Sequence, residues 1–359
     1  MRPEVGKESQ LHIETASTPL VEADPALDAE SPPTEADDTD RRRAKTPFSW
    51  AVFGPWAVPA LLVILFITFC FASPHIFATT TNVQVIVDGQ ATIVLLAMAL
   101  IIPLRAGDFD LSISAVMVLS GVIAGVLTAH GYSALIAFGA AILLGPLIGM
   151  INSLLVVAFG VDSLIATLGM LTVLTGIGRL ISKENLVTSI PQGLIHLSSH
   201  RLFGFNTAVW AGWIVALGLW YVFELTPTGR FLLFIGGNRN SAKLVGLRVS
   251  RFRFGAYIVS GTLAALVGLL FAGSLGSVDP GAGGSYLLPP ITAAFLGASA
   301  IKLGRFNVIG TLVAIYLLAV GISGLQLLGL AGWISDVFNG GCLIVAVSFS
   351  ILFRRAATK

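Results

Sequence analysis

The chain has 359 residues, of which 55% are hydrophobic and only 11% are charged, and its mean hydropathy is +0.88. A typical soluble domain is about a quarter charged. Residues 1–47 hold 11 of the 19 acids, so the rest of the chain has too few charges for a water-soluble surface. The composition therefore excludes an ordinary soluble protein and indicates one that sits in lipid, with no nucleic-acid partner expected.

Residues 1–47 are predicted to be a disordered acidic tail in the cytoplasm. The stretch is rich in Pro, Ala and acids, and it shows no apolar period. It carries 6 basic residues against 11 acids. It lacks the short apolar core of a signal peptide. Residues 48–359 are expected to form one transmembrane domain.

The transmembrane part is predicted to be all-α, a polytopic bundle of about ten helices. A spanning helix needs about 20 apolar residues. The run at 133–160 contains Pro146 and Asn152, which favours a tilt or kink, and the short run at 286–301 has Pro289 and Pro290 near its start. Whether some helices are broken stays open. The predicted spans are 51–73, 85–104, 111–129, 133–160, 163–181, 207–226, 254–275, 286–301, 306–329 and 333–353.

Lysine and arginine placement supports ten spans with both termini in the cytoplasm. Cytoplasmic loops are enriched in these residues. With ten spans, 16 of them fall in cytoplasmic segments and 3 in external segments, while two lie far out in the tail. Removing one span would invert every later loop and destroy this pattern.

The chain carries no motif for catalysis or ATP binding. It has no G-x-x-x-x-G-K-[ST] loop, no HExxH, no Cys/His cluster and no nucleophile elbow. Cys70 and Cys342 fall inside predicted spans and are expected to be free thiols. Buried ionisable groups suited to ion coupling are scarce, with Asp88 and Asp336 near span ends. We expect no enzymatic activity, no bound cofactor and no metal site.

A long basic loop at 226–253 is predicted to face the cytoplasm. It contains a plausible short helix in the stretch NSAKLVGLRV. Ala242 and Gly246 would share one face of that helix and allow another protein to approach closely, with Leu244 and Leu247 as flanking apolar anchors. The rim charges expected around this contact are Arg239, Lys243 and Arg248.

Four stretches, in order, resemble the permease subunits of bacterial ABC importers for monosaccharides of the ribose, xylose and galactose class. They are GDFDLSISA, DSLIATLGMLTVLTGIGRLIS, TPTGRFLLFIGGNRNSAKLVGLRV and FLGASAIKLGRFNVIGTLVA. The resemblance covers roughly 85–350. The chain departs from the family pattern at Leu287 and Pro289, where acids are common, and at Ala298, Leu303 and Phe306, where small residues are usual.

The resemblance implies a division of labour between several chains. Two permease copies would form the pathway in the bacterial inner membrane, and a periplasmic or lipid-anchored binding protein would deliver the sugar. A separate cytoplasmic ATPase would hold ATP and Mg, and the 226–253 loop would dock on it. An acidic tail is not part of the family pattern.

The stretch LRAGDFDLSISAV, at 104–116, breaks the apolar pattern with Arg105, Asp108 and Asp110. Asp110 either caps the following helix, with the other two as ordinary turn residues, or the stretch is a break inside the membrane that lines a cavity. In the second case Asp110 and Ser112 would face sugar hydroxyls.

Other polar residues in or beside the predicted spans are candidates for the same pathway. A neutral sugar needs scattered donors and acceptors, which the side chains named below could supply. Each could instead bond a neighbouring helix. The candidates besides Asp110 and Ser112 are Gln90, Asn152, Ser163 and Thr167.

Two other functions remain open from the sequence. One is an ABC permease for branched-chain amino acids or nucleosides, which shares this general architecture. The other is an ion-coupled secondary transporter, which would transport without ATP.

Overall fold

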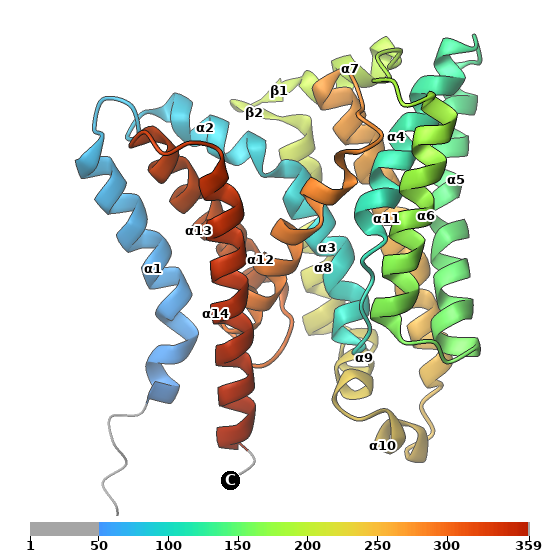
Figure 1. Ribbon diagram of the computed structural model, residues 1–359. Coiled ribbons are helices and arrows are strands. Elements are labelled where there is room, and N and C mark those ends of the chain that lie inside the picture. The colour runs from blue at the N-terminus through green and yellow to red at the C-terminus, as the bar shows by residue number, and fades with distance from the viewer. Residues whose placement is uncertain (1–49, 358–359) are drawn as a thin grey trace, which may run out of the picture. The chain divides into compact units, whose positions relative to one another are not determined.

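The computed structural model describes residues 50–357 of the chain, and the side chains of 54–348. The predicted tail at 1–47 lies outside the described residues. Within them the regular secondary structure is helical apart from an isolated bridge between Val187 and Val278 and one short antiparallel hairpin, β1 (Arg201–Leu202) and β2 (Phe205–Asn206) (Figure 1). The expected all-α class is confirmed.

Every predicted span corresponds to a helix, and several short helices lie between the spans. The long helices are α1 (Trp50–Ala72), α4 (Ile113–Ala129), α5 (Ala134–Ser153), α6 (Ser163–Ser182), α8 (Thr207–Leu225), α11 (Val249–Leu275), α13 (Val308–Leu327) and α14 (Trp333–Ala357). The shorter ones are α2 (Thr80–Gly89), α3 (Ala91–Arg105), η1 (Leu154–Ala158), α7 (Gln192–Ser199), α9 (Pro227–Gly237), α10 (Arg239–Leu244), η2 (Ala282–Tyr286) and α12 (Leu288–Ala298).

Seven helices in the described part are long and apolar enough to cross a membrane, with α2 and α3 counted as one. α4 and Trp333–Ser348 of α14 are shorter apolar helices. These spans make the chain a polytopic membrane protein.

The run predicted at 286–301 is not a full spanning helix. α12 has 11 residues, which is about 16 Å at 1.5 Å per residue, roughly half of a hydrocarbon core of about 30 Å. Residues 276–281 and the 3₁₀ helix η2 lead from α11 to α12. Pro289 and Pro290 stand in the first turn of α12, where their missing N–H groups are tolerated.

Two other spans deviate from regular α-helix. α2 and α3 meet at Gln90. α5 stays helical through Pro146 and changes to the π-helix η1 only after Ser153. The change of helix type in the 133–160 run therefore lies beyond Asn152.

Side-chain caps fix where several helices begin. Asp162 accepts from the N–H groups of Leu164 and Ile165, and Asn307 accepts from the N–H of Gly310 at 2.7 Å. A side-chain oxygen at this position satisfies backbone donors that the first helical turn leaves free.

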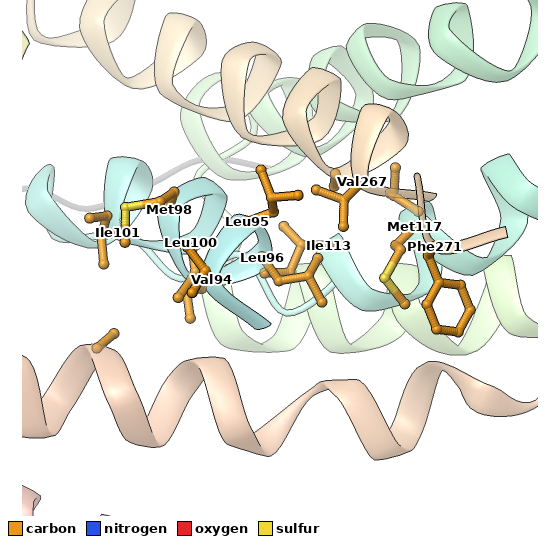
Figure 2. Close-up of a cluster of buried hydrophobic side chains, with 14 of the residues drawn as sticks. Val94, Leu95, Leu96, Met98, Leu100, Ile101, Ile113, Met117, Val267 and Phe271 are labelled. Carbon is orange, nitrogen blue, oxygen red and sulfur yellow. The ribbon is translucent and has the colours of Figure 1, made fainter. Parts of the chain in front are cut away.

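α3, α4 and α11 form the centre of the core. Figure 2 shows Leu95 and Leu96 of α3, Met117 of α4, and Val267 and Phe271 of α11 in one apolar cluster. α3 and α4 are buried on nearly all sides, as expected for helices that are apolar all round.

Glycines let α11 approach α5 at backbone distance. A Cβ added at Gly261 would lie 2.4 Å from the carbonyl oxygen of Gly145, and one added at Gly149 would lie 2.4 Å from that of Tyr257. Small residues at such crossings allow the close packing on which helix association in membranes depends.

The two ends of the bundle differ in what they carry. The start of α1 and the end of α14 lie at the same end as α9 and α10, whereas α7 and the hairpin lie at the other (Figure 1). A chain whose two ends lie at the same end of the bundle makes an even number of membrane passages, and ten predicted spans agree with this.

Gly261→Ala is expected to destabilise the bundle, because the added methyl group collides with the backbone of α5. Overpacking of this kind costs about 1–3 kcal/mol. Thermal unfolding of the detergent-purified chain measures the effect. Gly255→Ala on the same helix is the control, since nothing lies within 4 Å of its Cβ position. Equal melting temperatures for the two variants would refute the close packing.

Candidate functional site

Residues 106–112 form a non-helical break between α3 and α4. Gly107 has φ of +78°, a conformation that glycine adopts without steric cost. The N–H of Phe109 donates to Ser163 Oγ at 3.2 Å, and the N–H of Leu111 donates to Thr167 Oγ1 at 3.0 Å. Side chains of α6 thus replace the missing helical hydrogen bonds.

Asp110 is the centre of a buried polar network. Its Oδ1 accepts from Ser112 Oγ at 2.6 Å and from the Ser112 N–H at 3.2 Å, and its Oδ2 accepts from Ser260 Oγ at 3.2 Å. Asn152 Nδ2 donates to Ser112 Oγ at 2.8 Å. Ser260 lies eleven residues beyond Val249, the first residue of α11, about 16 Å along its axis. The network therefore lies well inside the bundle.

The two interpretations of this stretch are each partly realised. Asp110 makes a capping-type bond to the N–H of Ser112, directly before α4. The backbone around it is non-helical and is buried among neighbouring helices. However, Asp110 and Ser112 are each only 1% exposed, and their bonds go to neighbouring helices.

The structure brings five of the six pathway candidates together. All five side chains lie in or beside the 109–112 segment, and each makes a hydrogen bond there. They are those of Asp110, Ser112, Asn152, Ser163 and Thr167. The sixth candidate, Gln90, lies at the other end of α3. That helix has 15 residues, which puts about 22 Å between its ends.

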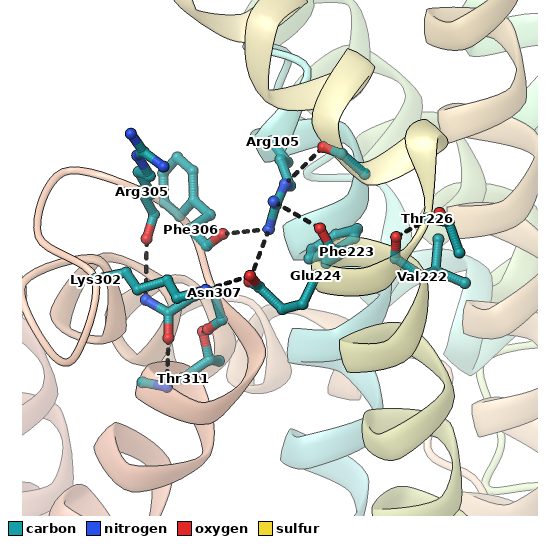
Figure 3. A network of polar contacts seen from close by, with 12 residues as sticks. Arg105, Val222, Phe223, Glu224, Thr226, Lys302, Arg305, Phe306, Asn307 and Thr311 are labelled. Atoms are coloured by element: carbon teal, nitrogen blue, oxygen red, sulfur yellow. Dashed lines mark hydrogen bonds and ion pairs between the residues drawn. The ribbon is translucent and has the colours of Figure 1, made fainter.

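Arg105 and Asp108 are not ordinary turn residues, so that part of the capping interpretation is wrong. Arg105 is 6% exposed and its guanidinium donates to the carbonyls of Phe223, Gly229 and Phe306 at 3.0–3.3 Å (Figure 3). Burial forces such a charge to find several partners.

Glu224 extends this network to a second loop. Its carboxylate lies 3.7 Å from Arg105 Nη1 and also pairs with Lys302. The network therefore joins α3, α8 and the loop that connects α12 to α13, as Figure 3 shows.

A cavity of about 820 Å³ opens beside the break. Its wall comes from the end of α3, from α9 and α10, from α12 and from the loop before α13. Four aromatic rings and three guanidinium groups line it, together with Asn238 and Ser241. The rings and guanidinium groups belong to Phe109, Phe234, Phe295, Phe306, Arg105, Arg230 and Arg305.

The 226–253 loop differs from its predicted form. The helix proposed there is shorter, because α10 ends at Leu244 and Gly246 follows at φ +81°. Ala242 is fully buried, against Ile235 and Val249. The predicted flat face of Ala242 and Gly246 is therefore wrong.

The remaining residues of the loop divide into inward and outward groups. Leu247 is partly buried against the cluster that contains Ala242. Lys243, Leu244 and Arg248 are exposed. Arg239, expected at the rim of a partner contact, instead donates to Asp108 Oδ1 at 2.7 Å.

Sequence reasoning missed three residues of α11 that face the break. Arg253 Nε donates to Asp108 Oδ2 at 2.6 Å, Tyr257 Oη donates to the carbonyl of Phe109 at 3.0 Å, and Ser260 reaches Asp110. Their spacing of four and then three residues puts them on one helix face. These residues could have been identified from the sequence, because they form a polar stripe on an otherwise apolar helix.

The chain matches the family described as "Branched-chain amino acid transport system / permease component" over residues 84–347. It is 30% identical to the ribose import permease protein RbsC of Escherichia coli (strain K12), over 80% of this chain and 90% of that protein. It is 29% identical to the D-allose transport system permease protein AlsC of the same strain, over 87% and 96%. It is 25% identical to the L-arabinose ABC transporter permease protein AraH of Azospirillum brasilense, over 84% and 88%.

The chain therefore belongs to this family of permease components. No solved structure matches it. Among the residues that the structure describes, no three His, Cys, Asp or Glu side chains are grouped to hold a metal ion.

Asp110→Ala is expected to lower the thermal stability of the purified chain, because Ser112 and Ser260 lose a buried acceptor. Leaving buried donors unpaired costs about 1–3 kcal/mol. Asp110→Asn should recover part of the loss, since the amide oxygen still accepts. Asp162→Ala, which removes only an exposed helix cap, is the comparison. If Asp110→Ala is no less stable than Asp162→Ala, the network does not stabilise the fold.

Proposed function

We propose that this chain is the permease subunit of an ATP-driven importer and carries a monosaccharide across the membrane. The observation that carries the proposal is the similarity to permeases named for ribose, allose and arabinose, each over at least 80% of this chain. The lining of the cavity agrees in chemistry: aromatic faces suit the apolar side of a sugar ring, and Asn238 and Ser241 suit its hydroxyls.

The proposal includes the partners that an importer of this kind needs. A second copy of the chain completes the pathway, a periplasmic or lipid-anchored binding protein delivers the sugar, and a separate ATPase binds ATP and Mg and hydrolyses ATP. The chain itself is not an enzyme and binds no cofactor. It lies in the bacterial inner membrane with both termini in the cytoplasm, since lysines and arginines concentrate at that face.

The tip of the 226–253 loop is the proposed contact with the ATPase. Leu244 is 88% exposed and Val245 66% exposed, directly after α10. Apolar side chains at this exposure suit burial in a partner groove. Lys243 and Arg248 flank them, and charges at such a rim affect the association rate and its salt dependence more than affinity.

Reconstitution tests the substrate and the energy source together. The chain is placed in liposomes with its ATPase and binding protein, and uptake of labelled D-ribose, D-allose, L-arabinose and L-leucine is measured with and without ATP. ATP-dependent uptake of one of the sugars is expected. Leucine uptake alone would replace the sugar by a branched-chain amino acid. Uptake by the chain alone, without ATP, would indicate an ion-coupled carrier.

Leu244→Asp is expected to weaken co-purification of the ATPase by about tenfold or more, because burying a charge in an apolar groove is costly. The chain should still insert, since the Leu244 side chain is almost fully exposed. Phe203→Asp is the matched control, as Phe203 is 91% exposed on the hairpin at the opposite end. Equal losses for both variants would show a general defect rather than a docking contact. Gly246→Trp is a poorer test, because its positive φ strains any side chain.

A further inference from the structure

Asp108 joins two separate segments by ion pairs in a buried position. Its side chain is 2% exposed. Arg253 of α11 binds it in a bidentate way, with Nε 2.6 Å from Oδ2 and Nη2 2.7 Å from Oδ1. Arg239, the first residue of α10, reaches Oδ1 at 2.7 Å. One carboxylate thus holds α10 and α11 against the break between α3 and α4.

The backbone reinforces this contact on the side of α9 and α10. Arg239 Nη2 also donates to the carbonyl of Gly107 at 2.7 Å. A Cβ placed on Gly236, near the end of α9, would lie 2.3 Å from the carbonyl oxygen of Arg105. The loop before α11 and the break are therefore in direct backbone contact, with no side chain between them.

On its other side, the break is fixed to three membrane helices. Ser163 and Thr167 of α6 hold its N–H groups. Asn152 of α5 and Ser260 of α11 belong to the network of Asp110. The break thus forms a continuous chain of contacts from α10 to the interior of the bundle.

We propose that Asp108 is a positioning residue that transmits displacement of α10 to the break and through it to α5 and α6. The proposal rests on the proposed function, in which the ATPase acts on the tip next to α10. Removing one partner of a buried ion pair leaves an uncompensated charge. The pair is therefore hard to open, and a movement of α10 carries Asp108 with it.

Asp108 and Arg239 lie 131 residues apart, and Asp108 and Arg253 lie 145 apart. These contacts are therefore not a consequence of local structure, whereas a helix cap is. They hold one particular placement of the loop relative to the membrane helices. Asp108 is not among the residues that line the cavity, and its role is to keep the loop and the break moving together.

The test compares Asp108→Asn and Arg239→Gln with the unmodified chain in two measurements. The first is sugar uptake per ATP hydrolysed, with the complete transporter in liposomes. The second is hydrogen exchange of residues 238–247 in the detergent-purified chain, without sugar. Arg251→Gln is the control, because Arg251 is exposed and lies two residues from Arg253.

We expect Asp108→Asn to keep ATP hydrolysis and to lower uptake per ATP about tenfold, within the usual range of coupling effects. Exchange in the loop should become faster, and Arg251→Gln should change neither quantity. Adding Arg239→Gln to Asp108→Asn should cause little further loss, since both act through one contact. If Asp108→Asn fails to fold, Arg239→Gln still tests the link, because it leaves Asp108 paired with Arg253.

Two results would overturn the proposal: loop exchange that does not change in either variant, or faster exchange with unchanged uptake per ATP. A failure of the proposed function looks different. In that case the unmodified transporter takes up none of the sugars, while hydrogen exchange still reports whether Asp108 holds the loop.

Discussion

A buried segment that leaves the helical conformation has to find partners for its free backbone groups within the protein, because an unpaired buried N–H or C=O group is costly. The break at 106–112 is the place where this constraint organises the protein. Ser163 and Thr167 of α6 accept from its N–H groups, and Tyr257 of α11 donates to a carbonyl. Because these three side chains have to reach the break, the positions of α6 and α11 around it are determined.

Charge placement follows from the same constraint. Arg105 and Asp108 are both buried, and each is surrounded by groups of opposite charge or by backbone carbonyls. Arg105 points toward α8 and the loop before α13, whereas Asp108 points toward α10 and α11. Two ends of one short turn are thus fixed to different parts of the bundle, with the cavity beside them.

The sequence predicted what depends on local pattern and composition. Apolar runs marked the spans, and polar interruptions identified Asp110 and four of the side chains around it. The eighth span was predicted too long, because apolar residues at 286–301 do not reveal that η2 and two prolines shorten the helix. The pairing of Asp108 with Arg253 joins residues 145 positions apart, and an arginine at the start of a span is already explained by its position at the cytoplasmic face. The sequence pattern predicts an exposed Ala242 only if the helix continues through Gly246. In the structure α10 ends at Leu244 and Ala242 is buried.

α11 brings these features together. Its residues Arg253, Tyr257 and Ser260 contact three consecutive residues of the break, Asp108, Phe109 and Asp110. Further along the same helix, Gly261 and Gly268 meet the backbones of α5 and α4. Packing at this distance resists sliding, because close-packed interiors do not deform gradually. The break, α4, α5 and α11 are therefore expected to move as one body. Since α11 begins five residues after α10 ends, any force on the loop reaches that body both through the chain itself and through Asp108.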